Sequence, residues 1–314
     1  YVALSHCWGK TRPLVTTTAT LTDRLSGIPI ADMPQTFRDA VSITRELRLE
    51  YLWIDSLCIL QDSKDDWEKE SANMGSIYGN SFLTISAAAA EDGEQGIFRP
   101  RPSRIHPPVE LKPRDGDYES LYVAEMPRNT PSETPQPVDT RAWCLQETAL
   151  APRVLVYGAE MLGWLCDSST DVENGYSTDH AEDPAPPLLA PRLRRPPQSS
   201  SKSTAFEFYR LLNESETATR TWTALVTQYT TRRLTFEKDR LPALSGLTME
   251  IQKETGDEYL AGIWRKDLKV DLFCLLAKGF EWKRPAEYRA PSWSWAAIEG
   301  RVRLELKLMR TAFH

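Results

Sequence analysis

Two clusters of polar residues, each at the end of a short apolar run, hold side chains that could do chemistry. Ser5-His6-Cys7-Trp8-Gly9 follows Tyr1-Val-Ala-Leu4, and Asp55-Ser56-Leu57-Cys58 follows Tyr51-Leu-Trp-Ile54. Both apolar runs are typical of strands that are buried on both faces. Open α/β sheets bind their ligands at the carboxyl ends of such strands, where the strand order changes direction. We therefore expect residues 5–9 and 55–58 to form one binding site.

Asp55 has a functional and a structural interpretation. Its carboxylate could accept hydrogen bonds from ribose hydroxyls, as acidic residues after a strand do in dinucleotide-binding folds. It could instead cap the turn that follows, or pair with Arg38 or Arg45. No glycine-rich phosphate loop is present, so the common dinucleotide and P-loop motifs are absent.

Ser5, His6 and Cys7 could contact a phosphate or could only organise the turn after the strand. A thiol nucleophile with a histidine base is a further chemistry that these residue types allow. Cys7 and His6 are adjacent, however, and adjacent residues of a strand point to opposite faces. A Cys58–His6 pair across the sheet edge is the remaining arrangement, and nothing else in the sequence supports it.

A third candidate segment is the short helix that we predict over residues 141–149. Trp143 lies four residues before Glu147, so both side chains occupy one face of that helix. Glu147 could be a catalytic carboxylate, or it could form an ion pair with Arg141 or Arg153 that contributes little to stability. Trp143 could stack on a flat ligand ring or could belong to the core.

Alternating strands and helices must position these residues. The sequence predicts strands at residues 1–7, 51–55 and 81–87, with helices at residues 37–49 and 65–80 between them. This βαβαβ order favours parallel pairing with right-handed crossovers. Further along we expect a β-hairpin of residues 109–112 and 121–125 inserted near residues 91–140, and strands at residues 153–157 and 161–167, the last of them antiparallel to its neighbour.

We expect three regions: a first domain over residues 1–167, a flexible Pro- and Ser-rich linker or loop over 168–204, and a C-terminal α+β region over 205–314. In the last region, helices are predicted at residues 206–212, 222–229, 239–255 and within 259–276. Terminal strands are predicted at residues 292–297 and 302–308.

The composition bounds the class of protein. The 314 residues are 41% hydrophobic and 26% charged, which is ordinary for a globular protein, and the net charge of −6 argues against a nucleic-acid partner. No apolar stretch reaches the length of a membrane span. The five cysteines lack metal-site spacing and the four histidines are far apart, so we expect no metal or cofactor, reduced thiols and a cytoplasmic location. The first residue is in mid-strand register, so we expect the natural amino terminus to be missing.

Three separated segments resemble the fungal heterokaryon incompatibility (HET) domain in both sequence and order. They are Tyr1-Val-Ala-Leu-Ser-His-Cys-Trp-Gly9, Leu52-Trp-Ile-Asp-Ser-Leu-Cys-Ile-Leu-Gln-Asp62 and Arg141-Ala-Trp-Cys-Leu-Gln-Glu147. His6 stands where the pattern commonly has an aromatic residue, and Cys144 stands where threonine is common. Neither difference removes a candidate carboxylate.

The resemblance implies an effector of programmed cell death in heterokaryon incompatibility, a form of fungal innate immunity. HET domains have been related to TIR domains, so it also implies a flavodoxin-like, mostly parallel α/β sheet. Some TIR domains hydrolyse NAD with a glutamate on a helix after the third strand. By this analogy Glu147 is the catalytic residue for cleavage through an oxocarbenium-like state. The predicted NAD-binding residues are Ser5, His6, Cys7, Trp8, Gly9, Asp55, Ser56 and Trp143.

An alternative function is a non-enzymatic interaction module that signals cell death by self-association or by binding a partner. The expected partners are NAD or a related nucleotide, a second copy of the chain through the loop at residues 56–66, and an allorecognition or NLR-type protein. The acidic residues of that loop also have a plain explanation, because acids are favoured in the first turn of a helix.

Overall fold

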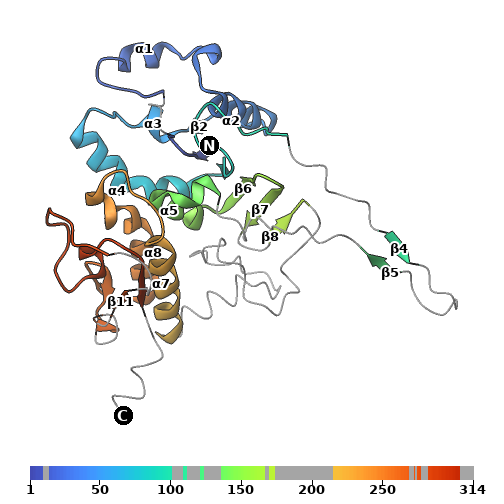
Figure 1. Cartoon of the computed structure of the whole chain (residues 1–314). Helices are drawn as coiled ribbons and strands as arrows, with labels where there is room; N and C mark the ends of the chain where they lie inside the picture. The colour runs from blue at the N-terminus through green and yellow to red at the C-terminus, as the bar shows by residue number, and fades with distance from the viewer. Residues whose placement is uncertain are drawn as a thin grey trace.

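The fold is α/β and is built on a mostly parallel sheet (Figure 1). The computed structural model describes residues 1–9, 14–100, 109–111, 121–123, 136–166, 170–173, 215–268, 272, 274–276 and 282–304. Its six-stranded sheet has the order β2-β1-β3-β6-β7-β8. The strands are β1 (Val2–Ser5), β2 (Leu52–Trp53), β3 (Leu83–Ser86), β6 (Arg153–Tyr157), β7 (Leu162–Cys166) and β8 (Thr170–Val172). The first four are parallel, and β7 and β8 continue antiparallel, as predicted for β7.

Alternation along β1 decides which helices each side chain meets. Every residue of β1 and of β3 is buried, since β1 lies between β2 and β3 and helices cover both faces. Val2 and Leu4 share one core with Phe37 of helix α2 (Gln35–Glu46), whereas Ala3 packs with Tyr78 of helix α4 (Lys64–Asn80). Ser5 therefore faces the α4 side of the sheet.

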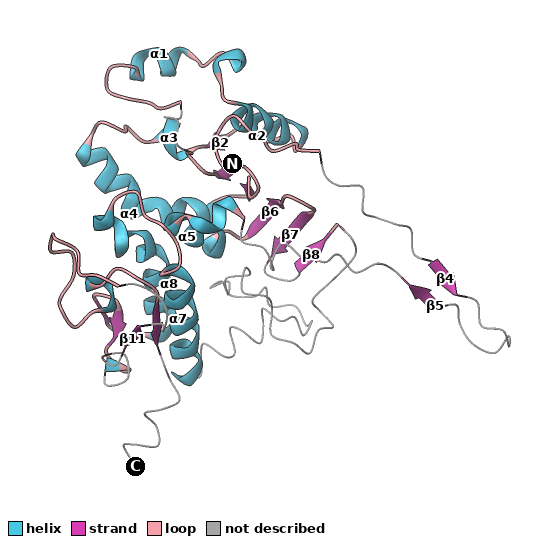
Figure 2. Ribbon diagram, viewed as in Figure 1, coloured by secondary structure: helices cyan, strands magenta, loops and turns pink. Residues whose placement is uncertain are grey.

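Helix α5 (Ala142–Leu150) lies between the sheet and the C-terminal region. One side of α5 contacts β1 and β3, and Leu145 and Leu150 on its other side share a core with helices α7 (Ser215–Tyr229) and α8 (Ser245–Thr255). Figure 2 shows α7 and α8 beside α4 and α5. Helices α4 and α8 cross closely at Gly75 and Gly246, where an added Cβ on Gly246 would lie 2.6 Å from the Gly75 Cα.

The C-terminal region differs in part from the sequence prediction. The predicted helix near residues 259–264 is wrong: β9 (Tyr259–Leu260) and β10 (Ile263–Trp264) form a hairpin. Ala261 and Gly262 between them have positive φ, which the tight turns of such hairpins require. Of the predicted helical segment 268–276, Leu268 is helical and its carbonyl accepts from the Leu272 N–H at 3.1 Å, whereas Cys274–Leu276 is strand β11, which pairs with β12 (Val302–Leu304).

Further differences concern single segments. The predicted helix at residues 239–255 is divided into η4 (Glu237–Arg240), η5 (Pro242–Leu244) and α8, and the predicted strand at 292–297 contains η6 (Trp295–Ala297). Proline at position 242 lacks the backbone N–H that a continuous helix needs. The predicted hairpin is confirmed as β4 (Val109–Leu111) and β5 (Leu121–Val123). Strand β8 lies at the start of the segment expected to be a linker, whose residues 174–204 are outside the described residues, as are residues 206–212.

The remaining short elements are α1 (Leu21–Ser26), η1 (Ile30–Asp32), α3 (Asp55–Cys58) and η2 (Pro137–Thr140). Within the part of the chain that the structure describes, no helix has both the length and the apolar composition of a membrane span.

Candidate functional site

The three candidate segments meet at the carboxyl ends of β1 and β2. The chain leaves β1, forms β2 on one side of it, and then forms β3 on the other side. Ligands of open α/β sheets bind at such a change of direction. Ser5 ends β1, Asp55 follows β2, and Glu147 lies on α5, which contacts β1.

Glu147 is buried among polar groups, with 2% of its surface exposed. Burial raises the pKa of its carboxyl, Arg141 opposes that rise, and Asp55 adds to it. The Ser5 hydroxyl and the Cys144 thiol are close enough to lower this pKa. Ser5 Oγ nevertheless has no hydrogen-bond partner of ordinary geometry within the described chain. The net pKa is raised, which makes the Glu147 carboxylate a stronger base than an exposed glutamate.

Arg141 is the cation at the centre of this cluster. Its guanidinium donates a hydrogen bond to the backbone carbonyl of His6. Burial lowers the pKa of Arg141, but the Cys144 thiol and the carboxylates of Asp55 and Glu147 raise it by more. Arg141 therefore stays charged and couples the two carboxylates.

Asp55 is held by its neighbours on three sides. Its Oδ2 accepts a hydrogen bond of 2.8 Å from the Trp8 indole, and its Oδ1 accepts one of 2.7 Å from the Ser56 backbone N–H. His6 Nδ1 lies 3.8 Å from Oδ1. The Arg141 guanidinium carbon lies 5.8 Å from the centre of the Trp8 ring, and Trp8 is partly exposed. Trp8 therefore lies between Asp55 and Arg141 at the solvent side of the cluster.

His6 is buried as a neutral ring. Burial lowers its pKa to about 4, against the attraction of Asp55, and Arg141 lowers it further. The ring meets Phe37 edge to face at 5.2 Å. At neutral pH His6 is a poor base, because its pKa is far below the ambient pH.

The thiols near the site are not activated. Burial raises the pKa of Cys7 to about 11 and the pKa of Cys144 well above its ordinary value, and it also raises the pKa of Cys58. A nucleophilic cysteine needs a thiolate. Together with the low pKa of His6, this argues against the thiol chemistry that the sequence left open.

The other predicted site residues differ in whether the structure leaves them available to a ligand. Gly9 has φ +76° and an added Cβ would lie 2.3 Å from Asp92 Cβ, so only glycine fits there. Ser56 is buried at the start of α3. Trp143 packs between two cores and its indole N–H donates to Asp239 Oδ2 at 3.4 Å, as a core tryptophan would.

Sequence analysis missed two members of the cluster. The Tyr78 hydroxyl donates to the Leu4 carbonyl at 3.1 Å, and burial with the nearby Glu147 raises its pKa. Its place in the amphipathic pattern of α4 could have suggested that it faces β1. Arg232, from the C-terminal region, reaches the cluster as well, and no local pattern marks it.

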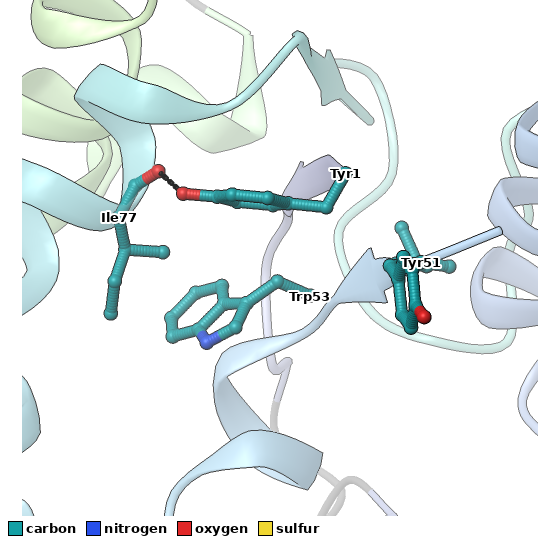
Figure 3. A pocket seen from close by; sticks show the side chains of 5 residues that line it. Tyr1, Tyr51, Trp53 and Ile77 are labelled. Carbon is teal, nitrogen blue, oxygen red and sulfur yellow. Dashed lines mark hydrogen bonds between the residues drawn. The ribbon is translucent and has the colours of Figure 1, made fainter. Parts of the chain in front are cut away.

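A pocket of about 410 Å³ lies at the amino ends of β1 and β2, opposite the candidate site (Figure 3). It is lined by Tyr1, Tyr51, Leu52, Trp53 and Ile77, and the Tyr1 hydroxyl donates to the Ile77 carbonyl at 2.5 Å. Tyr1 and Tyr51 precede β1 and β2, so this pocket is at the amino ends of the strands. It is not the predicted site, and the Glu147 cluster is closed in this conformation.

The loop at residues 56–66 is held in place by side chains. Asp62 accepts hydrogen bonds from the Thr18 backbone N–H and hydroxyl at 2.8 and 2.7 Å, and Asp66 accepts one from the Leu60 N–H at 2.8 Å. Self-association through this loop stays a prediction. Within the described residues, no three His, Cys, Asp or Glu side chains gather as metal ligands would.

Comparison with known proteins agrees with the motifs. Residues 1–147 match the family model "Heterokaryon incompatibility protein (HET)". Neither the curated proteins nor the solved structures give a match to the chain. A HET domain indicates a role in heterokaryon incompatibility and in the cell death that accompanies it. The segment that matches the heterokaryon incompatibility (HET) family, residues 1–147, includes the carboxyl ends of β1 and β2 and reaches Glu147 on α5.

Proposed function

We propose that this HET domain binds NAD at the carboxyl ends of β1 and β2, and that Glu147 promotes cleavage of the nicotinamide–ribose bond. The observation that carries the proposal is the meeting of Glu147, Asp55 and Arg141 at the change of strand direction. A buried carboxyl with a raised pKa beside a charged partner is typical of catalytic groups.

The proposed chemistry needs one carboxylate and water. The C1′–N bond breaks, its electron pair goes to the ring nitrogen, and nicotinamide leaves as a neutral molecule. The ribose passes through an oxocarbenium-like state that the Glu147 carboxylate stabilises. Water then adds to C1′, and its proton passes to Glu147 and on to solvent. Arg141 opposes the rise in the pKa of Glu147 and so favours its carboxylate form, and Asp55 would hold ribose hydroxyls.

Access to Glu147 requires Trp8 to move. Trp8 is the partly exposed aromatic residue beside Asp55, and its indole uses the oxygen that a ribose hydroxyl would need. In this proposal the ligand takes the place of the Trp8 indole on Asp55 Oδ2. Stacking of Trp8 on a base of the ligand would offset the loss of that hydrogen bond.

The closed cluster also favours a second candidate function. Only 2% of Glu147 is exposed, and buried polar networks commonly serve to hold a fold together. On this alternative, the HET domain acts in cell death by binding a partner or a second copy, and the Glu147 cluster is structural.

Nicotinamide release by the full chain separates the two functions. The assay is run at high protein concentration, because turnover can depend on assembly. Glu147→Gln keeps the size of the side chain and removes its charge, and we expect it to lower turnover by about 10²-fold or more. Glu254→Gln, an exposed glutamate on α8, is the matched control and retains activity.

Absence of turnover at every concentration, together with cell death caused by Glu147→Ala in cells, would refute the enzymatic proposal and support the interaction module. Equal turnover by wild type and Glu147→Gln would remove Glu147 from the chemistry.

A further inference from the structure

The first turn of α5 is completed by a segment that lies far beyond the HET match. Arg141 is the N-cap of α5 and makes no side-chain cap bond. The N–H of Ala142 instead donates to the Arg233 carbonyl at 2.9 Å, and the Arg233 N–H donates to the Thr140 carbonyl at 2.6 Å. The first N–H groups of a helix have no partner within the helix. The Arg233 carbonyl therefore supplies a hydrogen-bond acceptor for the Ala142 N–H from outside the HET segment.

The side chain of the neighbouring residue, Arg232, is buried against the turn at residues 139–141 that precedes α5. Only 5% of the Arg232 side chain is exposed. Its Nη1 donates to the Arg141 carbonyl at 3.2 Å, and its Nη2 lies 3.7 Å from Asp139 Oδ1. One planar guanidinium thus contacts the chain on both sides of residue 140, which a lysine ammonium is less suited to do.

Arg232 also belongs to the electrostatics of the cluster. Burial lowers the pKa of Arg232, and the nearby carboxylates of Asp139 and Glu147 oppose that effect. A Coulomb interaction acts on both partners, so the positive charge of Arg232 favours the ionised form of Glu147 in turn. Arg141 has the larger effect on the pKa of Glu147, and Arg232 acts in the same direction from the turn that it contacts.

Two more contacts fix α5 to the same region. The Gly246 N–H donates to the side-chain oxygen of the fully buried Gln146 at 2.7 Å, and Asp239 accepts from the Trp143 indole at 3.4 Å. Gln146 is adjacent to Glu147, so the C-terminal region contacts α5 at its start and beside the candidate catalytic residue.

We propose that Arg232 is a positioning residue of the Glu147 cluster: from the C-terminal region, it fixes the turn that carries Arg141 and adds a second positive charge beside Glu147. Residues 1–147 therefore do not complete this site by themselves. Only the role of Glu147 in cleavage is taken from the proposed function. The measurements below need no substrate, so their failure is distinct from an absence of NAD cleavage.

The test uses the full chain with Arg232→Gln and Arg232→Lys. Arg233→Gln is the matched control, because the Arg233 side chain is exposed and only its backbone contacts α5. Ionisation of Glu147 is followed by infrared titration of protein with ¹³C-labelled glutamate, and Glu147→Gln identifies the band. Hydrogen exchange reports on the amides of residues 140–147.

We expect Arg232→Gln to raise the pKa of Glu147 and to speed exchange at residues 140–147 roughly tenfold, as the loss of about one buried hydrogen bond would. Arg232→Lys keeps the charge, so it should speed exchange while changing the titration of Glu147 less. Arg233→Gln should change neither.

A merely structural Arg232 would speed exchange without moving the titration of Glu147, and that result would overturn the proposal. Unchanged exchange in both Arg232 variants would overturn it as well. If Arg232→Gln does not fold, Arg232→Lys decides: faster exchange confined to residues 140–147 together with a raised pKa of Glu147 supports the proposal, and wild-type exchange or an unmoved titration of Glu147 contradicts it.

Discussion

Replacing His6 should remove a specific part of the acid sensitivity of this protein. Burial lowers the pKa of His6 from its ordinary value of 6.5 to about 4. Between these values the unfolded chain binds a proton that the folded chain excludes, so stability falls as the pH falls from about 6.5 towards 4. The difference between the two pKa values corresponds to a loss of about 2 kcal/mol at pH 5 and about 3 kcal/mol at pH 4.

Urea unfolding of wild type, His6→Phe and His6→Asn, from about pH 7.5 to about pH 4.5, measures this loss. Both variants lack the titrating ring, but they pack differently against Phe37 and should differ in stability at the higher pH. Relative to wild type, both should gain about 2 kcal/mol between pH 7.5 and 5. Other groups titrate in all three proteins and cancel in the difference. A difference from wild type that stays constant with pH in both variants would refute the reasoning.

Two further substitutions test the packing that supports the site. Gly246→Ala places a Cβ 2.6 Å from the Gly75 Cα, so α4 and α8 must separate; we expect a cost of about 1–3 kcal/mol, reduced by a helix-propensity gain of about 1 kcal/mol. Its thermal midpoint should fall below that of exposed Ser76→Ala, and equal midpoints would contradict the close crossing. Asp39→Ala removes the acceptor of the Ile97 N–H at 2.7 Å, and urea unfolding should show a loss of about 1–3 kcal/mol. Full stability of Asp39→Ala would contradict this role.

The order of strands and helices in the first half of the chain is predictable from the sequence. Strands such as β1 and β3 are buried on both faces, so they appear as apolar runs, and the helices between them carry a 3.6-residue period. Parallel pairing follows from the crossovers. The hairpin at residues 259–264 was not predictable in this way, because its two-residue strands are too short for a period and depend on the turn at Ala261 and Gly262.

The meeting of Ser5 and Asp55 is also predictable, since parallel strands end at the same edge of a sheet, whereas Glu147 lies on helix α5 and was expected there only from the resemblance. The burial of Glu147 is not predictable, because it depends on packing of the C-terminal region against the far side of α5. Arg232 could not be found for the same reason. Its partners, Asp139 and the Arg141 carbonyl, are distant in the chain and are set by tertiary structure alone.

Helix α5 has a consequence for how related genes can recombine. A hybrid that joins the first 147 residues of one parent to the remainder of another would have its junction within this helix. The start of α5 and the C-terminal helices that pack on it would then come from different parents. Mismatched faces would leave Leu145 and Leu150 without their complementary surface. Functional alleles should therefore inherit α5 with the downstream sequence that packs on it.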